Sequence, residues 1–313
     1  MSFGFGYDHG AGPHIQGYRS AEPRQGISPR VLGAIILAIF ALIGYFGRTE
    51  VNPVTGEKQR IAMTVQEEMA LGLESAPQMA AKMGGAIDPR RDPRAREVAL
   101  VGRRLVERSD ARLSPYVENF RFTLLDDPGT VNAFALPGGP IFITAGLYDK
   151  LKDEAELAGV LGHEIGHVIN RHAAEHMATG QLGQLLTAAF GIGMSDRDGG
   201  RTATLAAAMV NQLTQLRFSR DDETESDHYG LRYMAQAGYD PSAMLQVMEV
   251  LRDAAQGGGS PPEFLATHPL PESRLADLRD ELIRAYPDGI PSTLGRGEPL
   301  PRGGSTLPGF FRR

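Results

Sequence analysis

The hydrophobic pattern of the chain contains two long apolar stretches between amphipathic segments. Residues 31–47, VLGAIILAIFALIGYFG, carry no charge over 17 positions, which is the lower limit for a helix that crosses a membrane. The second stretch, Leu157 to His176, is apolar on most sides of a helix and predicts a buried one. Further helices are expected at 64–83, 95–108, 222–236, 242–256 and 272–286.

Three short β-prone segments precede the second apolar stretch. Tyr116 to Leu125 alternates in part, and Asn132 to Leu136 is joined to Pro140 to Thr144 by the turn sequence Pro-Gly-Gly. The pattern predicts a small antiparallel sheet placed directly before the buried helix. We therefore expect an α+β, mainly helical domain over residues 61–286.

The flanks of this domain lack periodic structure. Residues 1–30 and 287–313 are rich in glycine, proline and polar residues and are expected to be disordered, with a linker at 48–60. We interpret residues 31–47 as an uncleaved transmembrane anchor. A cleaved signal peptide and a buried soluble helix remain alternatives, but about 30 residues precede the stretch and no clear cleavage site follows it. Arginines on both sides leave its orientation open.

Composition narrows the chemistry that the chain can perform. The 313 residues carry a formal net charge of −6, which argues against a nucleic-acid binder. The chain has no cysteine, so thiolate metal sites, disulfides and a cysteine nucleophile are excluded. A metal ion would have to be held by carboxylates and by some of the eight histidines.

The predicted buried helix contains the motif His163-Glu164-Ile165-Gly166-His167. Residues four apart lie on one helix face, ~6 Å apart along the axis, so both imidazoles can bind one metal ion. Glu164 projects nearby, where it can take a proton from a metal-bound water, as in zinc peptidases. The alternatives are a helix with two hydrogen-bonded core histidines and a zinc site without activity.

A third protein ligand is expected, because catalytic zinc usually has three protein ligands and a water. Glu223 and Asp227 share one face of the predicted helix 222–236. Glu223 can bind the metal while Asp227 accepts a hydrogen bond from a ligand imidazole. Glu225 points away from Glu223 and is expected in solvent.

Two more histidines, His172 and His176, follow the motif. In a straight helix they point away from His163, so they cannot bind the same metal ion. We expect surface positions or hydrogen bonds behind the ligands.

The segments HEIGHVINRH and SRDDETESDHYG resemble those of the gluzincin metallopeptidases that include the CAAX prenyl endoprotease and the HtpX-type peptidases. The HExxH and ExxxD pattern of that family puts zinc ligands at His163, His167 and Glu223. It places Glu164 at the glutamate of HExxH and Asp227 at the aspartate of ExxxD. At the position before the aspartate a serine replaces the family's alanine, a small-for-small change of little expected consequence.

NAFALPGGP and THPLPESR are similar to further family segments, and the resemblance covers about residues 60–285. It is closest to a periplasmic catalytic domain that carries a tetratricopeptide tail, and this chain ends without one. It implies a zincin-like fold, one Zn²⁺ per chain, and a bacterial inner-membrane protein with a single anchor and a periplasmic catalytic domain.

The resemblance also implies protein or peptide substrates. These would bind extended along the strand formed by Asn132, Ala133, Phe134 and Ala135. His268, in the C-terminal family segment, either caps the zinc or stabilises the oxyanion, and a plain surface histidine is the alternative. Arg274 is expected to pair with an active-site acid.

We therefore predict a zinc endopeptidase that cleaves misfolded or unassembled cell-envelope proteins, with Glu164 as the base for a zinc-bound water. The substrate class follows from the resemblance alone. The alternative is a latent or inactive zinc-containing, chaperone-like binder of envelope proteins. A prenyl-protein processing enzyme is a weaker hypothesis, because one anchor forms no multi-span chamber. The sequence predicts neither the oligomeric state nor the cleavage preference.

Overall fold

The computed structural model describes Met1 and residues 49–303, with gaps at 53, 61–62, 178–179, 181–216, 257–261 and 270–271. The expected tail and anchor, at residues 2–30 and 31–47, lie outside the described residues. Among the helices of the described part, none is long and apolar enough to cross a membrane.

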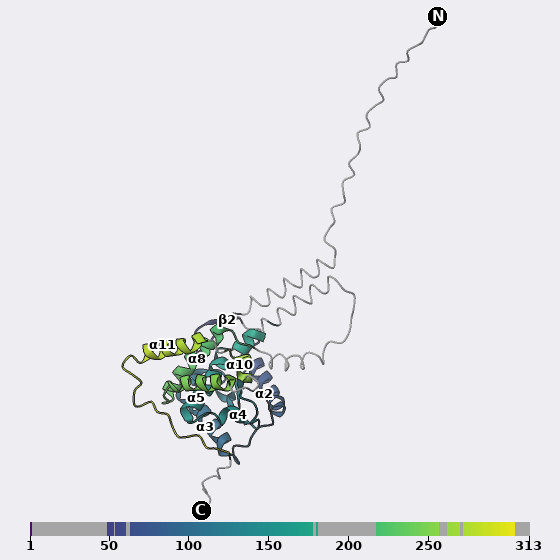
Figure 1. The fold of residues 1–313 in the computed structure, drawn as a ribbon. Coiled ribbons are helices and arrows are strands. Elements are labelled where there is room, and N and C mark those ends of the chain that lie inside the picture. The colour runs from purple at the N-terminus through teal and green to yellow at the C-terminus, as the bar shows by residue number, and fades with distance from the viewer. Residues whose placement is uncertain are drawn as a thin grey trace, which may run out of the picture.

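The described part is mainly helical with a small sheet, as the hydrophobic pattern predicted (Figure 1). The helices are α2 (Val65–Lys82), α3 (Pro93–Arg108), α4 (Ala145–Tyr148), α5 (Glu154–Ile169), α8 (Arg220–Gln236), α9 (Ala243–Gln256), α10 (Glu263–Thr267) and α11 (Glu272–Ala285), with 3₁₀ turns at Asp110–Leu113 and Val117–Asn119. Residues 172–177 are also helical. The strands are β1 (Thr49–Val51), β2 (Lys58–Arg60), β3 (Arg121–Leu125), β4 (Ala133–Ala135) and β5 (Pro140–Thr144).

The main sheet has the strand order β3-β5-β4 and is mixed. The β4–β5 pair is antiparallel, with Phe134 opposite Phe142, whereas β3 and β5 are parallel. The expectation of a purely antiparallel sheet was therefore wrong. The chain reverses once between β3 and β4 and again at Gly138 and Gly139, both at positive φ, so β5 returns in the direction of β3 and inserts between the two. This insertion leaves β4 at the edge of the sheet.

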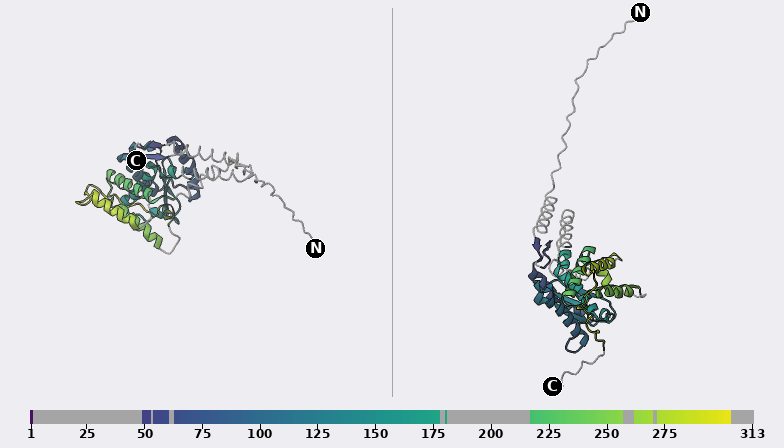
Figure 2. Two further views of the ribbon diagram at one scale, coloured as in Figure 1. Left: turned by 90° about the horizontal axis from the view of Figure 1, so that it is seen from above. Right: turned by 90° about the vertical axis from the view of Figure 1, so that its left-hand side faces the viewer.

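Helix α5 is the central element of the domain. Asp153 caps its N-terminus by accepting the backbone N–H of Glu156 at 3.0 Å, and every residue from Ala155 to Ile169 is buried. A Cβ atom on Gly166 would lie only 2.9 Å from the Cα of Ser226, so α5 and α8 pack at glycine distance. In both views of Figure 2, α2 and α3 lie on the opposite side of the domain from α9 and α11.

Both ends of α5 are also held by segments from the two ends of the described chain. The side-chain amide of Asn52, after β1, donates to Ile169 O at 2.6 Å. At the other end, the N–H groups of Glu154 and Ala155 donate to the carbonyls of Glu298 and Arg296 at 3.0 and 2.9 Å. Residues 287–303, expected to be disordered, thus include a segment that satisfies amides left free at a helix N-terminus.

Candidate metal centre

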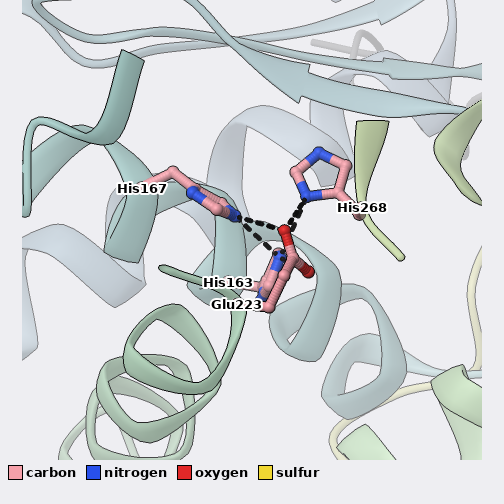
Figure 3. Close-up of side chains that lie close together, drawn as sticks. All are labelled: His163, His167, Glu223 and His268. Atoms are coloured by element: carbon pink, nitrogen blue, oxygen red, sulfur yellow. Dashed lines mark hydrogen bonds and ion pairs between the residues drawn. The ribbon is translucent and has the colours of Figure 1, made fainter. Parts of the chain in front are cut away.

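Four buried side chains, His163, His167, Glu223 and His268, bring one potential ligand atom each within 4.8 Å of one another. Figure 3 shows them converging from three elements. The two motif histidines come from α5, Glu223 from the first turn of α8, and His268 from the residue after α10.

The two histidines of the motif face Glu223. Their Nε2 atoms lie 3.0 Å apart, and the Glu223 oxygens are 3.5 Å from His163 Nε2 and 3.4 Å from His167 Nε2. Burial holds the pKa of His167 well below its usual value, so this ring is neutral. Burial opposes ionisation of Glu223, but His268 and Arg274 outweigh it and hold the pKa of this carboxyl well below its usual range.

Asp227 and Arg274 lie behind this cluster. His163 Nδ1 is 2.9 Å from Asp227 Oδ1, and because a carboxylate only accepts, Nδ1 carries the proton and Nε2 of the neutral ring has the free lone pair. Arg274 donates from Nη2 to Asp227 Oδ1 at 2.8 Å and from Nη1 to Glu223. The pairing that the sequence suggested for Arg274 is therefore present, with both acids.

Glu164 lies beside the cluster and is fully buried. Neither of its carboxylate oxygens has a hydrogen-bond partner among the described residues. The nearest group of the opposite sign is His268, whose Nε2 is 3.7 Å from Glu164 Oε1. Burial raises the pKa of Glu164. A buried carboxylate that accepts no hydrogen bond is costly, so these oxygens are positioned for a water or a substrate.

His268 closes the cluster on the remaining side. Its Nδ1 donates to Glu223 Oε1 at 2.9 Å and lies 3.4 Å from His163 Nε2. Its ring stacks on Phe264 at a centroid distance of 4.3 Å. Burial lowers the pKa of His268, but the carboxylates of Glu223 and Glu164 outweigh burial and raise it. With 1% of its surface exposed, His268 is not a surface histidine.

The donor set fits a divalent metal ion. Two imidazole nitrogens and a carboxylate that stays ionised surround one point, and imidazole donors favour zinc and its transition-metal neighbours over Mg²⁺ or Ca²⁺. The Nε2 atom of His163, which carries a lone pair, lies 3.0 Å from Nε2 of His167. This approach is unfavourable unless a cation or a proton lies between the two nitrogens.

The expected substrate strand borders a cavity of about 360 Å³ next to the cluster. Thr144 N–H donates to Asn132 O, and Leu136 N–H donates to Pro140 O. The main-chain polar groups of Asn132 and Leu136 therefore point toward β5. Alternation along an antiparallel strand then turns the N–H and C=O groups of Ala133 and Ala135 outward. The cavity is lined by Met79, Lys82, Met83, Asp127, Thr130, Asn132, Phe134, Ala135, Phe218, Glu263, Thr267 and His268.

Phe218, near the cluster, escaped the sequence analysis, whereas His172 takes one of the two placements expected for it, a hydrogen bond behind a ligand. The ring of Phe218 stacks on His167 at a centroid distance of 4.0 Å, and His172 Nδ1 lies 2.9 Å from His167 Nδ1. Phe218 sits directly before the ExxxD segment, where its apolar character alone did not distinguish it from a core residue.

The family model described as Peptidase family M48 matches residues 92–282. The beta-barrel assembly-enhancing protease of Escherichia coli (strain K12) is 34% identical over 198 residues, 62% of this chain and 40% of that protein. The protein of the same name from Yersinia pestis is 32% identical over 256 residues, 78% of this chain and 50% of that protein. Mitochondrial metalloendopeptidase OMA1 of Schizosaccharomyces pombe is 29% identical over 280 residues, 86% of this chain and 77% of that protein.

These matches confirm the family resemblance drawn from the sequence motifs. The chain spans half or less of the length of the bacterial relatives named above.

Proposed function

The chain belongs to peptidase family M48, and on that premise we propose that it is a zinc-dependent endopeptidase. One observation carries the proposal: a fully buried Glu164, whose oxygens have no hydrogen-bond partner among the described residues, lies beside a cluster of two histidines and an ionised carboxylate. A structural metal site does not require a buried carboxylate that lacks hydrogen bonds, whereas a hydrolase needs a base there.

His163, His167 and Glu223 would hold one Zn²⁺ per chain. When bound, zinc supplies a Lewis acid that polarises a carbonyl and lowers the pKa of a bound water to about 7. Asp227 orients His163 through Nδ1, and Arg274 holds Asp227 and Glu223 in place. These contacts keep the donor atoms converged without a change of rotamer.

Glu164 acts as the general base and then as the general acid. One of its free oxygens takes a proton from the attacking water, and the same group delivers a proton to the nitrogen of the departing amine. Its raised pKa suits this exchange, because a carboxyl that binds a proton more tightly is a better base than an ordinary one.

Substrate binds as an extended peptide that adds a strand to β4. The outward N–H and C=O groups of Ala133 and Ala135 pair with its main chain, and the adjacent cavity takes one large apolar side chain against Met79, Met83 and Phe134. Recognition of the main chain suits unfolded or unassembled proteins of varied sequence.

We place the protein in the bacterial inner membrane, anchored through residues 31–47 with the catalytic domain in the periplasm. The name of the Escherichia coli relative, which refers to β-barrel assembly, supports cell-envelope proteins as substrates. This assignment rests on similarity and on the apolar stretch of the sequence.

His268 would cap the site and keep it closed. Its Nδ1 lies against both Glu223 and His163, where a water would otherwise bind, so this histidine has to move before catalysis. The same contact favours a second candidate function, a latent zinc-containing binder of envelope proteins.

The test is to measure metal content and casein cleavage on the full-length chain and on Glu164→Gln, with Glu249→Gln on α9 as a matched control. We expect one zinc in all three proteins and cleavage by the parent and the control only. Zinc without cleavage in the parent would favour the latent binder, and absence of zinc would refute the metal site.

A further inference from the structure

We propose that His172 is a positioning residue that fixes the tautomer and orientation of His167, and that Glu225 completes this support. The inference rests on the proposed function, since it takes His167 Nε2 as a zinc-binding atom. His172 is 1% exposed, and its Nδ1 lies 2.9 Å from His167 Nδ1. His172 follows the metal-binding motif in the sequence, and a straight helix would have pointed it away from His163.

The proton positions on His167 and His172 follow from Glu225, the last residue in this series of contacts. His172 Nε2 is 3.0 Å from Glu225 Oε2, and a carboxylate only accepts, so Nε2 of His172 carries a proton. In the neutral His172 ring Nδ1 is then an acceptor, and it accepts the Nδ1–H of His167. His167 Nε2 is left with a free lone pair that faces Glu223 and His163.

The two zinc ligands on α5 are therefore supported in different ways. His163 donates directly to Asp227, whereas His167 donates to an imidazole that in turn donates to Glu225. Glu225 is 27% exposed and half-buried rather than solvated, so its charge still acts on the His172 ring. Ser226 Oγ lies 3.3 Å from His172 Nδ1. The serine that stands in place of the family's alanine therefore also contacts His172.

A break in the helix makes the contact possible. Helix α5 ends at Ile169, and Arg171 adopts a left-handed conformation with φ of 60° before residues 172–177 form a new helical turn. Arg171 Nε donates to the buried Glu68 at 2.9 Å, which stabilises a conformation that is unfavourable for a non-glycine residue. The new direction of the chain turns His172 back toward His167.

His176 provides a matched control. It lies in the same helical segment and also bonds to a carboxylate, with Nε2 2.7 Å from Asp222 Oδ2, but its ring contact is with Phe218 rather than with a zinc ligand. Removing His176 deletes its hydrogen bond to Asp222, whereas removing His172 deletes its hydrogen bonds to Glu225 and to the proposed zinc ligand His167.

The test is zinc affinity of the full-length chain, measured by competition with a chelator, together with the thermal stability of the metal-free protein. We expect His172→Ala to weaken zinc binding about 10–100-fold, the effect typical of losing a partner of a metal ligand. His176→Ala should leave the affinity within about twofold of the parent, because it supports no ligand.

Conservative variants separate positioning from folding. Asn carries its oxygen where His172 carries Nδ1, so His172→Asn should recover most of the affinity, whereas His172→Gln, with no acceptor at that position, should not. Glu225→Gln should weaken binding less than His172→Ala, because an amide oxygen still accepts from Nε2. Equal zinc affinity of His172→Ala and His176→Ala, or no recovery with Asn, would overturn the inference while a zinc-binding, cleaving parent kept the proposed function intact.

Discussion

Arg274 and Asp227 form a buried, two-pronged ion pair: Nη2 lies 2.8 Å from Oδ1, and Nε donates to Oδ2. Asp227 also receives the Nδ1–H of His163, and Arg274 reaches Glu223. Helix α11, far along the sequence from α5, therefore determines how two of the proposed zinc ligands are held.

Replacement of Arg274 by leucine should destabilise the metal-free protein by about 3–5 kcal/mol, because Asp227 and Glu223 would be left as buried charges without their cation. The measurement is the free energy of unfolding from a denaturant titration in the presence of a chelator. Arg279→Leu is the control, since Arg279 is exposed on the same helix. A loss no larger than that of the control would show that the buried pair contributes nothing.

Replacement of His268 by alanine separates the two roles considered for this residue. If His268 caps the metal, the variant should keep its zinc and cleave casein faster than the parent. If His268 stabilises an oxyanion, kcat should instead fall by about 10²–10³. His228→Ala, which removes an exposed histidine of α8, is the control for non-specific effects.

Peptide substrates with one N-methylated amide each should reveal main-chain recognition by β4. Binding needs only those substrate amides that donate to the outward carbonyls of Ala133 and Ala135. In an extended peptide, the N–H groups of alternate residues face the edge of the sheet. We therefore expect KM to rise at every second position near the cleaved bond. Equal effects at neighbouring positions would argue that substrate does not add to the sheet.

His228 and Glu281 should give the protein a small stability term that depends on pH. The side-chain hydrogen bond to Glu281 raises the pKa of His228, against burial that lowers it. The pair therefore stabilises fully below the unfolded pKa of about 6.5, and this stabilisation is lost as pH rises through the higher folded pKa.

The size of this term is a few tenths of a kcal/mol, because His228 is 53% exposed and solvent screens the pair. The check is the free energy of unfolding of the parent and of Glu281→Gln, at about pH 5.5 and about pH 8.5. The parent should lose more stability than the variant on going to the higher pH. An identical loss in both proteins would contradict the assignment.

The local parts of the site could be predicted from the sequence. His163 and His167 lie on one face because they are four residues apart in a helix, and Glu223 and Asp227 do so for the same reason. Helical spacing depends only on the backbone geometry within about one turn, and the apolar residues around the motif were enough to predict that α5 is buried.

The relations between distant segments were decided by the tertiary structure. The insertion of β5 between β3 and β4 left the edge strand beside the cluster, and no periodicity contains that order. His172 was expected to point away from the metal because the helix was assumed straight. The left-handed Arg171, stabilised by Glu68 from α2, redirects it.

Residues 287–303 show the same dependence on tertiary structure. The composition of residues 287–303 predicted disorder, yet Arg296 O and Glu298 O accept the first amides of α5. The sequence by itself determined which side chains share a helix face. Only the folded chain decided which remote carboxylates, carbonyls and imidazoles meet that face, because those contacts depend on the packing of elements that are not neighbours in sequence.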